Sequence, residues 1–243
     1  MLKLSLRLKF ICAALIAGCL SSQVLAGATV DALPFSKKLK LARAGDHEAQ
    51  ISLAHDYEQG ANSARKDAVE AARWYREAAL AGNVEAQHLL AKLLTQGAAG
   101  LPADASAGLK LLESAAAKGF APSQNELGLR YQTGNGVKQD VKTAAEWFRK
   151  AAAQKLPQAQ VNLGLLLVKG EGLSQDRSEA FKQFSEAAQA GDVWAMNDLG
   201  SMYEMGWGTA KDIAKAKDYY ERAAAQGNAS AAANLKRLQA KAQ

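Results

Sequence analysis

A period of 36 or 37 residues runs through most of this 243-residue chain and limits what it can fold into. Two sets of residues recur at that spacing, namely five turn glycines and five aspartates. They are Gly60, Gly97, Gly134, Gly170 and Gly206, with Asp67, Asp104, Asp140, Asp176 and Asp212. A fixed period of this length is typical of arrays in which each repeat is one supersecondary unit and the core grows by stacking. The period therefore predicts one continuous array.

Each repeat has the pattern of two short amphipathic helices around a glycine turn. In the last full repeat, Ala195, Leu199 and Tyr203 form one apolar stripe at the 3.6-residue period of a helix. The turn glycine can supply the positive φ that ends this helix, and the aspartate that follows can cap the start of the second helix. A glycine after the leucine, as at Gly164, lets the second helix come close.

The predicted fold class is all-α, an α/α superhelical solenoid of five helix-turn-helix repeats with half-repeat caps. The predicted segments are a signal peptide at 1–26, a linker at 27–35, an N-terminal capping helix at 36–45, repeats at about 46–83, 84–120, 121–156, 157–192 and 193–228, and a C-terminal capping helix at 229–243. The second repeat has leucines in place of the usual aromatic pair and Gly108 in place of an alanine. We expect it to be the most loosely packed unit.

Residues 1–26 have the three parts of an export signal. Basic residues precede an apolar run at 10–20, and small residues lead to a cleavage site after Ala26. The run is shorter than the roughly 20 residues that a membrane-spanning helix needs. Because Ile16-Ala17-Gly18-Cys19 also resembles a lipobox, two predictions stay open. One is a periplasmic bacterial protein cleaved after Ala26, and the other is an outer-membrane lipoprotein acylated at Cys19.

The cysteines and the charge exclude several classes of protein. Both cysteines, Cys12 and Cys19, fall in the export signal, so the form cleaved after Ala26 has no disulfide, zinc thiolate or thiol nucleophile. Loss of the three basic residues of the signal lowers the formal net charge from +6 to +3. The basic pI of the whole chain therefore gives no ground for predicting a nucleic-acid partner.

Few residues stand in catalytic patterns. His55, His88 and Glu58 could form a weak metal or acid–base site if adjacent first helices hold them side by side. However, there is no H-E-x-x-H pair and no third ligand at a fixed spacing. The run 134–136 (Gly-Asn-Gly) lacks the preceding strand and the following lysine of a phosphate loop, and no serine stands in G-x-S-x-G. The sequence predicts a protein that is not an enzyme and needs no cofactor or metal.

The full repeat pattern is A-x-x-x-L-G-x-x-Y-x-x-G-x-G-V-x-x-D-x-x-x-A-x-x-W-[YF]-x-x-A-A, and it is clearest in the third and fifth repeats. It resembles the Sel-one-like repeat (SLR) family, a relative of the tetratricopeptide repeats, over nearly all of residues 46–243. The resemblance implies a right-handed superhelical array whose first helices line a concave face. It also implies that the protein binds a protein or peptide rather than catalysing a reaction.

Three functions remain open under this resemblance. The chain is similar to exported adaptors for assembly or signalling in the cell envelope, and to immunity proteins that neutralise secreted toxins acting in the periplasm. One cysteine-rich branch of the family is linked to β-lactam binding and hydrolysis. The helix-linking cysteine pairs of that branch are absent here, which argues against the hydrolase.

The positions that the pattern leaves free predict a docking surface. Counting from the small residue near the start of each first helix, such as Ala159 or Ala195, positions 1, 5, 8, 9 and 12 face the core. Positions 3, 7, 10 and 11 then lie on the opposite face. This face is polar in the first two repeats and more apolar from the third to the fifth. The predicted apolar strip is Leu129, Val161, Leu165, Val168 and Met205, rimmed by Arg130, Gln132, Lys169 and Glu204.

Trp207 lies at the tip of a glycine turn and is a second candidate contact with a partner. For both features an alternative stays open. Neighbouring helices of the same array could cover the strip, and Trp207 could pack over the side where Met202 lies.

Overall fold

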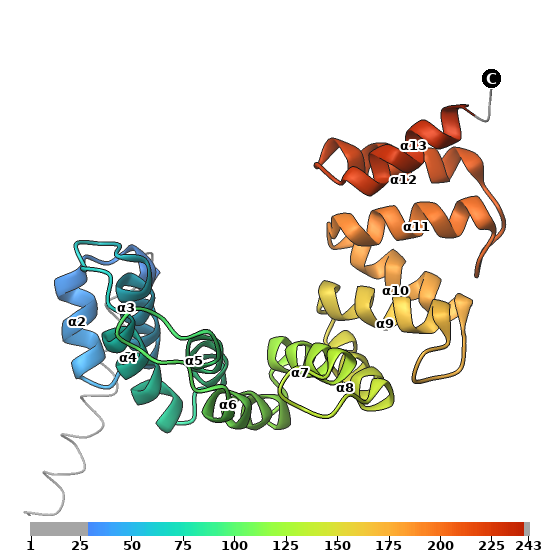
Figure 1. Ribbon diagram of the computed structural model, residues 1–243. Coiled ribbons are helices and arrows are strands. Elements are labelled where there is room, and N and C mark those ends of the chain that lie inside the picture. The colour runs from blue at the N-terminus through green and yellow to red at the C-terminus, as the bar shows by residue number, and fades with distance from the viewer. Residues whose placement is uncertain (1–28, 241–243) are drawn as a thin grey trace, which may run out of the picture. The chain divides into compact units, whose positions relative to one another are not determined.

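The computed structural model describes residues 29–240, and regular secondary structure in this range is helical (Figure 1). The predicted export signal, with Cys19 and the cleavage site after Ala26, lies outside the described residues. Within residues 29–240, no helix has the length and apolar character needed to cross a bilayer. The helices are η1 (Val30–Ala32), α2 (Phe35–Arg43), α3 (His47–Gln59), α4 (Ala68–Leu80), α5 (Val84–Gln96), α6 (Ala105–Ala117), α7 (Ala121–Thr133), α8 (Val141–Ala152), α9 (Pro157–Lys169), α10 (Arg177–Gln189), α11 (Val193–Met205), α12 (Ile213–Ala225) and α13 (Ala229–Ala240).

The recurring aspartates and turn glycines have the local roles predicted for them. Each aspartate is the N-cap of a second helix, and its side chain accepts a hydrogen bond from a backbone N–H in the first turn. These caps are Asp67, Asp104, Asp140, Asp176 and Asp212. All five turn glycines have positive φ, a conformation that glycine adopts without a steric penalty. The period in the sequence is therefore a period of helix starts and stops.

The mid-helix glycines hold first and second helices in close contact, as predicted. At three positions an added Cβ would lie 2.6 to 2.8 Å from an aromatic ring of the second helix, which is too close for carbon atoms. The pairs are Gly128 with Phe148, Gly164 with Phe184, and Gly200 with Tyr220. Each of these rings is almost fully buried, so it fills the place that a side chain on the first helix would otherwise take.

The expectation that the second repeat is loosely packed is wrong at the interface between its own helices. A Cβ at Gly108 of α6 would lie 2.8 Å from the carbonyl oxygen of Ala91 in α5 and would overlap the side chain of Thr95. The glycine that replaces an alanine therefore brings the two helices closer together. Leu112, which stands where other repeats have an aromatic residue, is fully buried.

The described residues form two compact units, which we treat separately. One comprises residues 29–81 with 99–101, and the other comprises 82–98 with 102–240. In the first unit, α3 packs against α2 and α4, and a buried ion pair of 2.8 Å joins Lys38 to Asp56. In the second unit, each helix from α5 to α13 packs against the next (Figure 1). The predicted all-α architecture of helix-turn-helix repeats is confirmed.

Candidate functional site

Neighbouring first helices of the second unit meet in a fixed register. Position 1 is Ser123 in α7, Ala159 in α9, Ala195 in α11 and Ala231 in α13. At two junctions, an asparagine at position 4 donates to an asparagine at position 3 of the preceding first helix. The pairs are Asn162 Nδ2 to Asn125 Oδ1 at 2.9 Å, and Asn234 Nδ2 to Asn197 Oδ1 at 3.0 Å. These amide pairs form a ladder across the repeats.

The ladder is interrupted between α9 and α11. Position 3 of α9 is Val161, which has no polar group, and position 4 of α11 is Asp198. The Asp198 carboxylate accepts a hydrogen bond of 3.1 Å from the neighbouring Asn197 side chain. Within residues 29–240 no cation forms an ion pair with it. Burial is the main cause that raises the pKa of Asp198; with the opposing Asn197 hydrogen bond and the added charge of Asp192, the pKa is about 6.

A hollow of about 170 Å³ lies at this interruption. One side comes from α9 and α10, with Leu165, Val168 and Phe184. The other side comes from α11 and the turn after it, with Asp198, Ser201, Met202 and Trp207. The lining is thus mostly apolar and holds one ionisable group, which is the carboxyl of Asp198.

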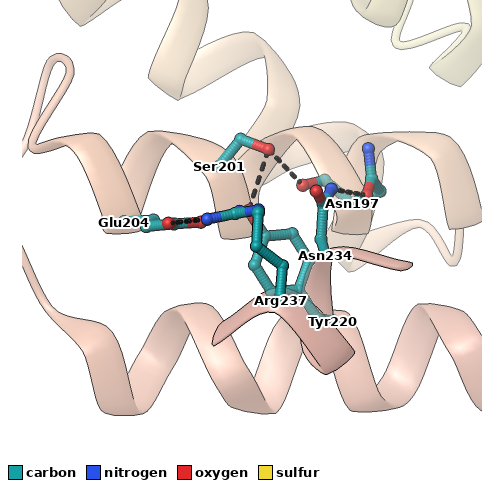
Figure 2. A network of polar contacts seen from close by, with 6 residues as sticks. All are labelled: Asn197, Ser201, Glu204, Tyr220, Asn234 and Arg237. Atoms are coloured by element: carbon teal, nitrogen blue, oxygen red, sulfur yellow. Dashed lines mark hydrogen bonds and ion pairs between the residues drawn. The ribbon is translucent and has the colours of Figure 1, made fainter. Parts of the chain in front are cut away.

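The next junction, between α11 and α13, is filled by polar side chains (Figure 2). The Arg237 guanidinium donates two hydrogen bonds of 2.6 Å to the two carboxylate oxygens of Glu204. The Tyr220 hydroxyl donates to Glu204 Oε2 at 3.0 Å and lies 3.0 Å from Ser201 Oγ. Burial, together with the neighbouring Glu204 carboxylate, raises the pKa of Tyr220 to about 12, and the Ser201 hydrogen bond opposes this. Of the four residues of this network, only Ser201 also lines the hollow.

The structure gives different surroundings to the residues of the predicted apolar strip. Val161 is buried in the core, and Leu129 and Val168 are half-buried against it. Leu165 and Met205 are exposed, by 38% and 55%. Leu165 and Val168 come together at the hollow, whereas Leu129 and Met205 do not line it. Contact of any of these residues with a partner stays a prediction.

The residues of the predicted polar rim also differ in how far they are exposed. Glu204 is 6% exposed and paired with Arg237, so its carboxylate is engaged inside the chain. Arg130 is also buried, and its Nε lies 3.4 Å from Glu126 Oε1. Gln132 is half-buried. Lys169 is exposed and 3.9 Å from Glu171, a distance at which a surface ion pair contributes little.

Trp207 is half-buried, so it is neither fully exposed at the tip of its turn nor fully covered by the side where Met202 lies. The Arg177 guanidinium lies 4.4 Å from the centroid of its ring, which is the geometry of a cation–π contact. The indole also lines the hollow together with Met202. Trp207 therefore packs near Met202 and still contributes to an open surface.

Sequence reasoning missed Asp198. The signal was present, because an acidic residue stands at position 4 of α11 where α9 and α13 have asparagines, and a valine stands at position 3 of α9. It could be recognised only by pairing position 4 with position 3 of the preceding repeat. Trp194, exposed by 62%, was also not singled out.

The histidines weighed as a metal or acid–base site have other neighbours. His55 Nδ1 lies 3.0 Å from the Tyr75 hydroxyl, and His88 Nδ1 lies 3.0 Å from Ser123 Oγ. Burial, together with the charge of Lys92, lowers the pKa of His88 to about 4. In the part of the chain that the structure describes, no three His, Cys, Asp or Glu residues are grouped so that they could hold a metal ion.

Comparison with known proteins agrees with this geometry. The Sel1 repeat family model matches residues 47–83, 84–120, 121–156, 157–192 and 195–228. The structure is similar to that of a protective antigen of uropathogenic Escherichia coli strains that displays an SLR fold. The two chains are 32% identical with a TM-score of 0.76, and the match covers 84% of this chain and 43% of the antigen. This chain thus spans less than half the length of that antigen.

Two further solved structures are similar. A Sel1 repeat protein from Oxalobacter formigenes is 29% identical with a TM-score of 0.70, and the match covers 81% of this chain and 86% of that one. A sel1 repeat protein from Klebsiella pneumoniae subsp. pneumoniae is 23% identical over 85% of this chain and all of that one, with a TM-score of 0.53, and it shows the fold alone. Among curated proteins none is similar to this chain. The matched repeats and the helix hairpins show that the chain belongs to the Sel1 repeat family, whose fold is suited to protein interaction.

Proposed function

We propose that this chain is an exported, non-catalytic binding protein that docks a protein or peptide on the first-helix face of its second unit. The observation that carries the proposal is the hollow at the α9–α11 junction, where Leu165 is exposed beside Val168 and Trp207. Apolar side chains exposed around a concavity are typical of docking sites for a helix or an extended segment. The family fold is consistent with this role.

Export is supported by the basic, apolar and small-residue order of residues 1–26. Cell fractionation and intact-mass measurement test this part of the proposal. A periplasmic protein with the mass of residues 27–243 is the expected result. A membrane-bound protein whose mass corresponds to lipid on Cys19 would show that the lipoprotein alternative holds and that cleavage after Ala26 does not occur. The full-length mass in the cytoplasm would contradict export.

Docking is tested by affinity purification of the tagged full chain from the periplasm, followed by mass spectrometry. The variant Leu165→Asp places a charge at the edge of the hollow and is expected to lower partner recovery at least about tenfold. Because Leu165 is already 38% exposed, the loss in free energy of unfolding should not exceed about 2 kcal/mol. Leu80→Asp is the matched control, since Leu80 is 78% exposed and lies in the other unit.

Equal recovery with wild type, Leu165→Asp and Leu80→Asp would show that the partner docks elsewhere. A partner that is a secreted toxin would make the protein an immunity protein, and a cell-envelope component would make it an adaptor. Purified protein should not hydrolyse a chromogenic cephalosporin, and measurable turnover would overturn the non-catalytic part of the proposal.

A further inference from the structure

We infer that the hollow receives one basic side chain of the partner, whose cationic end meets the Asp198 carboxylate and whose aliphatic stem lies against Leu165 and Val168. This inference rests on the proposed docking at the same face. It adds the chemical feature that the partner has to present there, an arginine or a lysine.

The first argument is charge complementarity. Among residues 29–240, the two carboxylates that are almost fully buried each have a cation of their own. Lys38 Nζ lies 2.8 Å from Asp56, and Arg237 lies 2.6 Å from Glu204. Asp198, in contrast, lies in a mostly apolar hollow and, within residues 29–240, has no ion pair. A partly buried charge without a counter-ion is costly, and a cation from outside the chain removes that cost.

The second argument is why the chain does not supply the cation itself. In the filled junction, position 7 of α13 is Arg237, and it reaches back to α11. At the α9–α11 junction, position 7 of α11 is Ser201, whose hydroxyl is bonded instead to Tyr220 and to the Asn197 carbonyl. The place that a basic residue occupies in one junction is therefore taken by a short side chain in the other.

The third argument is the shape of a basic side chain. Arginine and lysine have a long apolar stem and a charged tip, so they can cover Leu165 and Val168 while still reaching a carboxylate. An entirely apolar occupant would bury the Asp198 carboxylate without a partner, which is unfavourable, and an acidic occupant would be repelled. Trp207 in the same wall already carries the Arg177 guanidinium on its ring, so this surface tolerates cations.

Nuclear magnetic resonance with two small probes tests the inference on the full chain. N-butylguanidinium has an apolar stem and a cationic end, and N-butylurea is its neutral analogue. The Trp207 indole N–H and the Asp198 carboxyl carbon report on the hollow. N-butylguanidinium should shift both signals saturably, and N-butylurea should bind at least about tenfold more weakly, because a charge-assisted hydrogen bond is lost.

Asp198→Asn keeps the shape of the side chain and removes its charge, so it should weaken N-butylguanidinium binding at least about tenfold and lower partner recovery by a similar factor. Asp218→Asn is the matched control, because that aspartate is exposed and already beside Arg222, 3.6 Å away. It should leave both measurements unchanged. Urea unfolding of each variant checks that it is folded.

The failures of this inference and of the proposed function can be told apart. Equal binding of the two probes, or unchanged recovery of the partner with Asp198→Asn, would contradict the cationic occupant while leaving docking through Leu165 intact. Absence of any shift at Trp207 with either probe would likewise overturn it. Unchanged recovery with Leu165→Asp would instead contradict the proposed function.

Discussion

Two consecutive junctions of the second unit share a backbone arrangement and differ in their side chains. We call the α9–α11 contact around Val161 and Asp198 the open junction, and the α11–α13 contact around Glu204 and Arg237 the closed junction (Figure 2). Five residues at the open junction have an equivalent 36 residues later at the closed one. The equivalent pairs are Val161 with Asn197, Leu165 with Ser201, Val168 with Glu204, Phe184 with Tyr220, and Asp198 with Asn234.

The comparison shows that substitution on one helix face decides whether a repeat junction is filled. On the closed side, the Tyr220 hydroxyl and the Arg237 guanidinium both donate hydrogen bonds to Glu204, and these side chains fill the space between the helices. On the open side, Val161 has no amide that could pair with Asp198, and Phe184 and Val168 have no hydroxyl or carboxylate that could build the polar network of the closed side. The hollow thus lies where α9 and α10 have apolar residues and where the short Ser201 of α11 takes the place of Arg237.

The largest expected effect comes from breaking the closed junction with Arg237→Ala. This variant leaves the buried Glu204 carboxylate without its cation, so the free energy of unfolding should fall by about 2 to 4 kcal/mol. Urea unfolding followed by circular dichroism measures the change. Arg222→Ala removes an exposed arginine of the preceding helix α12, 3.6 Å from Asp218, and should cost less than about 1 kcal/mol. Equal losses for the two variants would contradict a structural role for the closed junction.

A smaller effect of opposite sign is expected at the open junction with Asp198→Asn. Because the folded-state pKa of Asp198 is about 6 and its ordinary value is 3.8, the folded protein binds this proton more tightly than the unfolded chain does. The stability contributed by that proton is fully present below about pH 4 and is lost as the pH rises through 6. At pH 7.5 the asparagine variant should therefore be more stable, by up to about 3 kcal/mol.

The gain from Asp198→Asn should largely disappear at about pH 3, where the wild-type carboxyl is mostly neutral in both states. Unfolding curves at the two pH values measure this, with Asp218→Asn as the control that changes stability by less than about 0.5 kcal/mol at either pH. A gain that does not depend on pH would show that the Asp198 charge is not the cause.

The smallest expected effect on stability comes from rebuilding the ladder with Val161→Asn. The new amide would take the position toward Asp198 that Asn197 has toward Asn234, with its Nδ2 group in place of its Oδ1 turned to the partner, so that its N–H stabilises the carboxylate. The pKa of Asp198 should fall from about 6 toward its ordinary value. Stability should fall by about 1 to 2 kcal/mol, since the apolar burial of Val161 is lost and the new hydrogen bond offsets only part of that loss.

Titration of the Asp198 carboxyl carbon by nuclear magnetic resonance measures this shift. Val137→Asn, at a half-buried turn valine in another repeat, should leave the Asp198 titration unchanged. A pKa that stays near 6 in Val161→Asn would mean that the amide does not reach across the junction, and that position 3 is not what separates the two junctions.

The parts of the fold that depend on local chemistry could be predicted. Capping aspartates, turn glycines and the glycine–ring contacts, such as Gly164 against Phe184, follow from short-range sterics and hydrogen bonding within one repeat. The candidate site was predicted only in part. Leu165, Val168 and Trp207 do line one hollow, whereas Val161 is in the core and Glu204 is paired with Arg237.

The sequence by itself determined that this chain is an array of helix hairpins, because the period and the residues at each helix end carry that information within about 36 residues. Only the tertiary structure decided which junction is open. Neighbouring first helices meet with an offset, so that position 4 of one helix contacts position 3 of the helix before it. Aligning the repeats compares equal positions and therefore does not place Asp198 opposite Val161. That pairing depends on how two helices pack, which is a property of the assembled array.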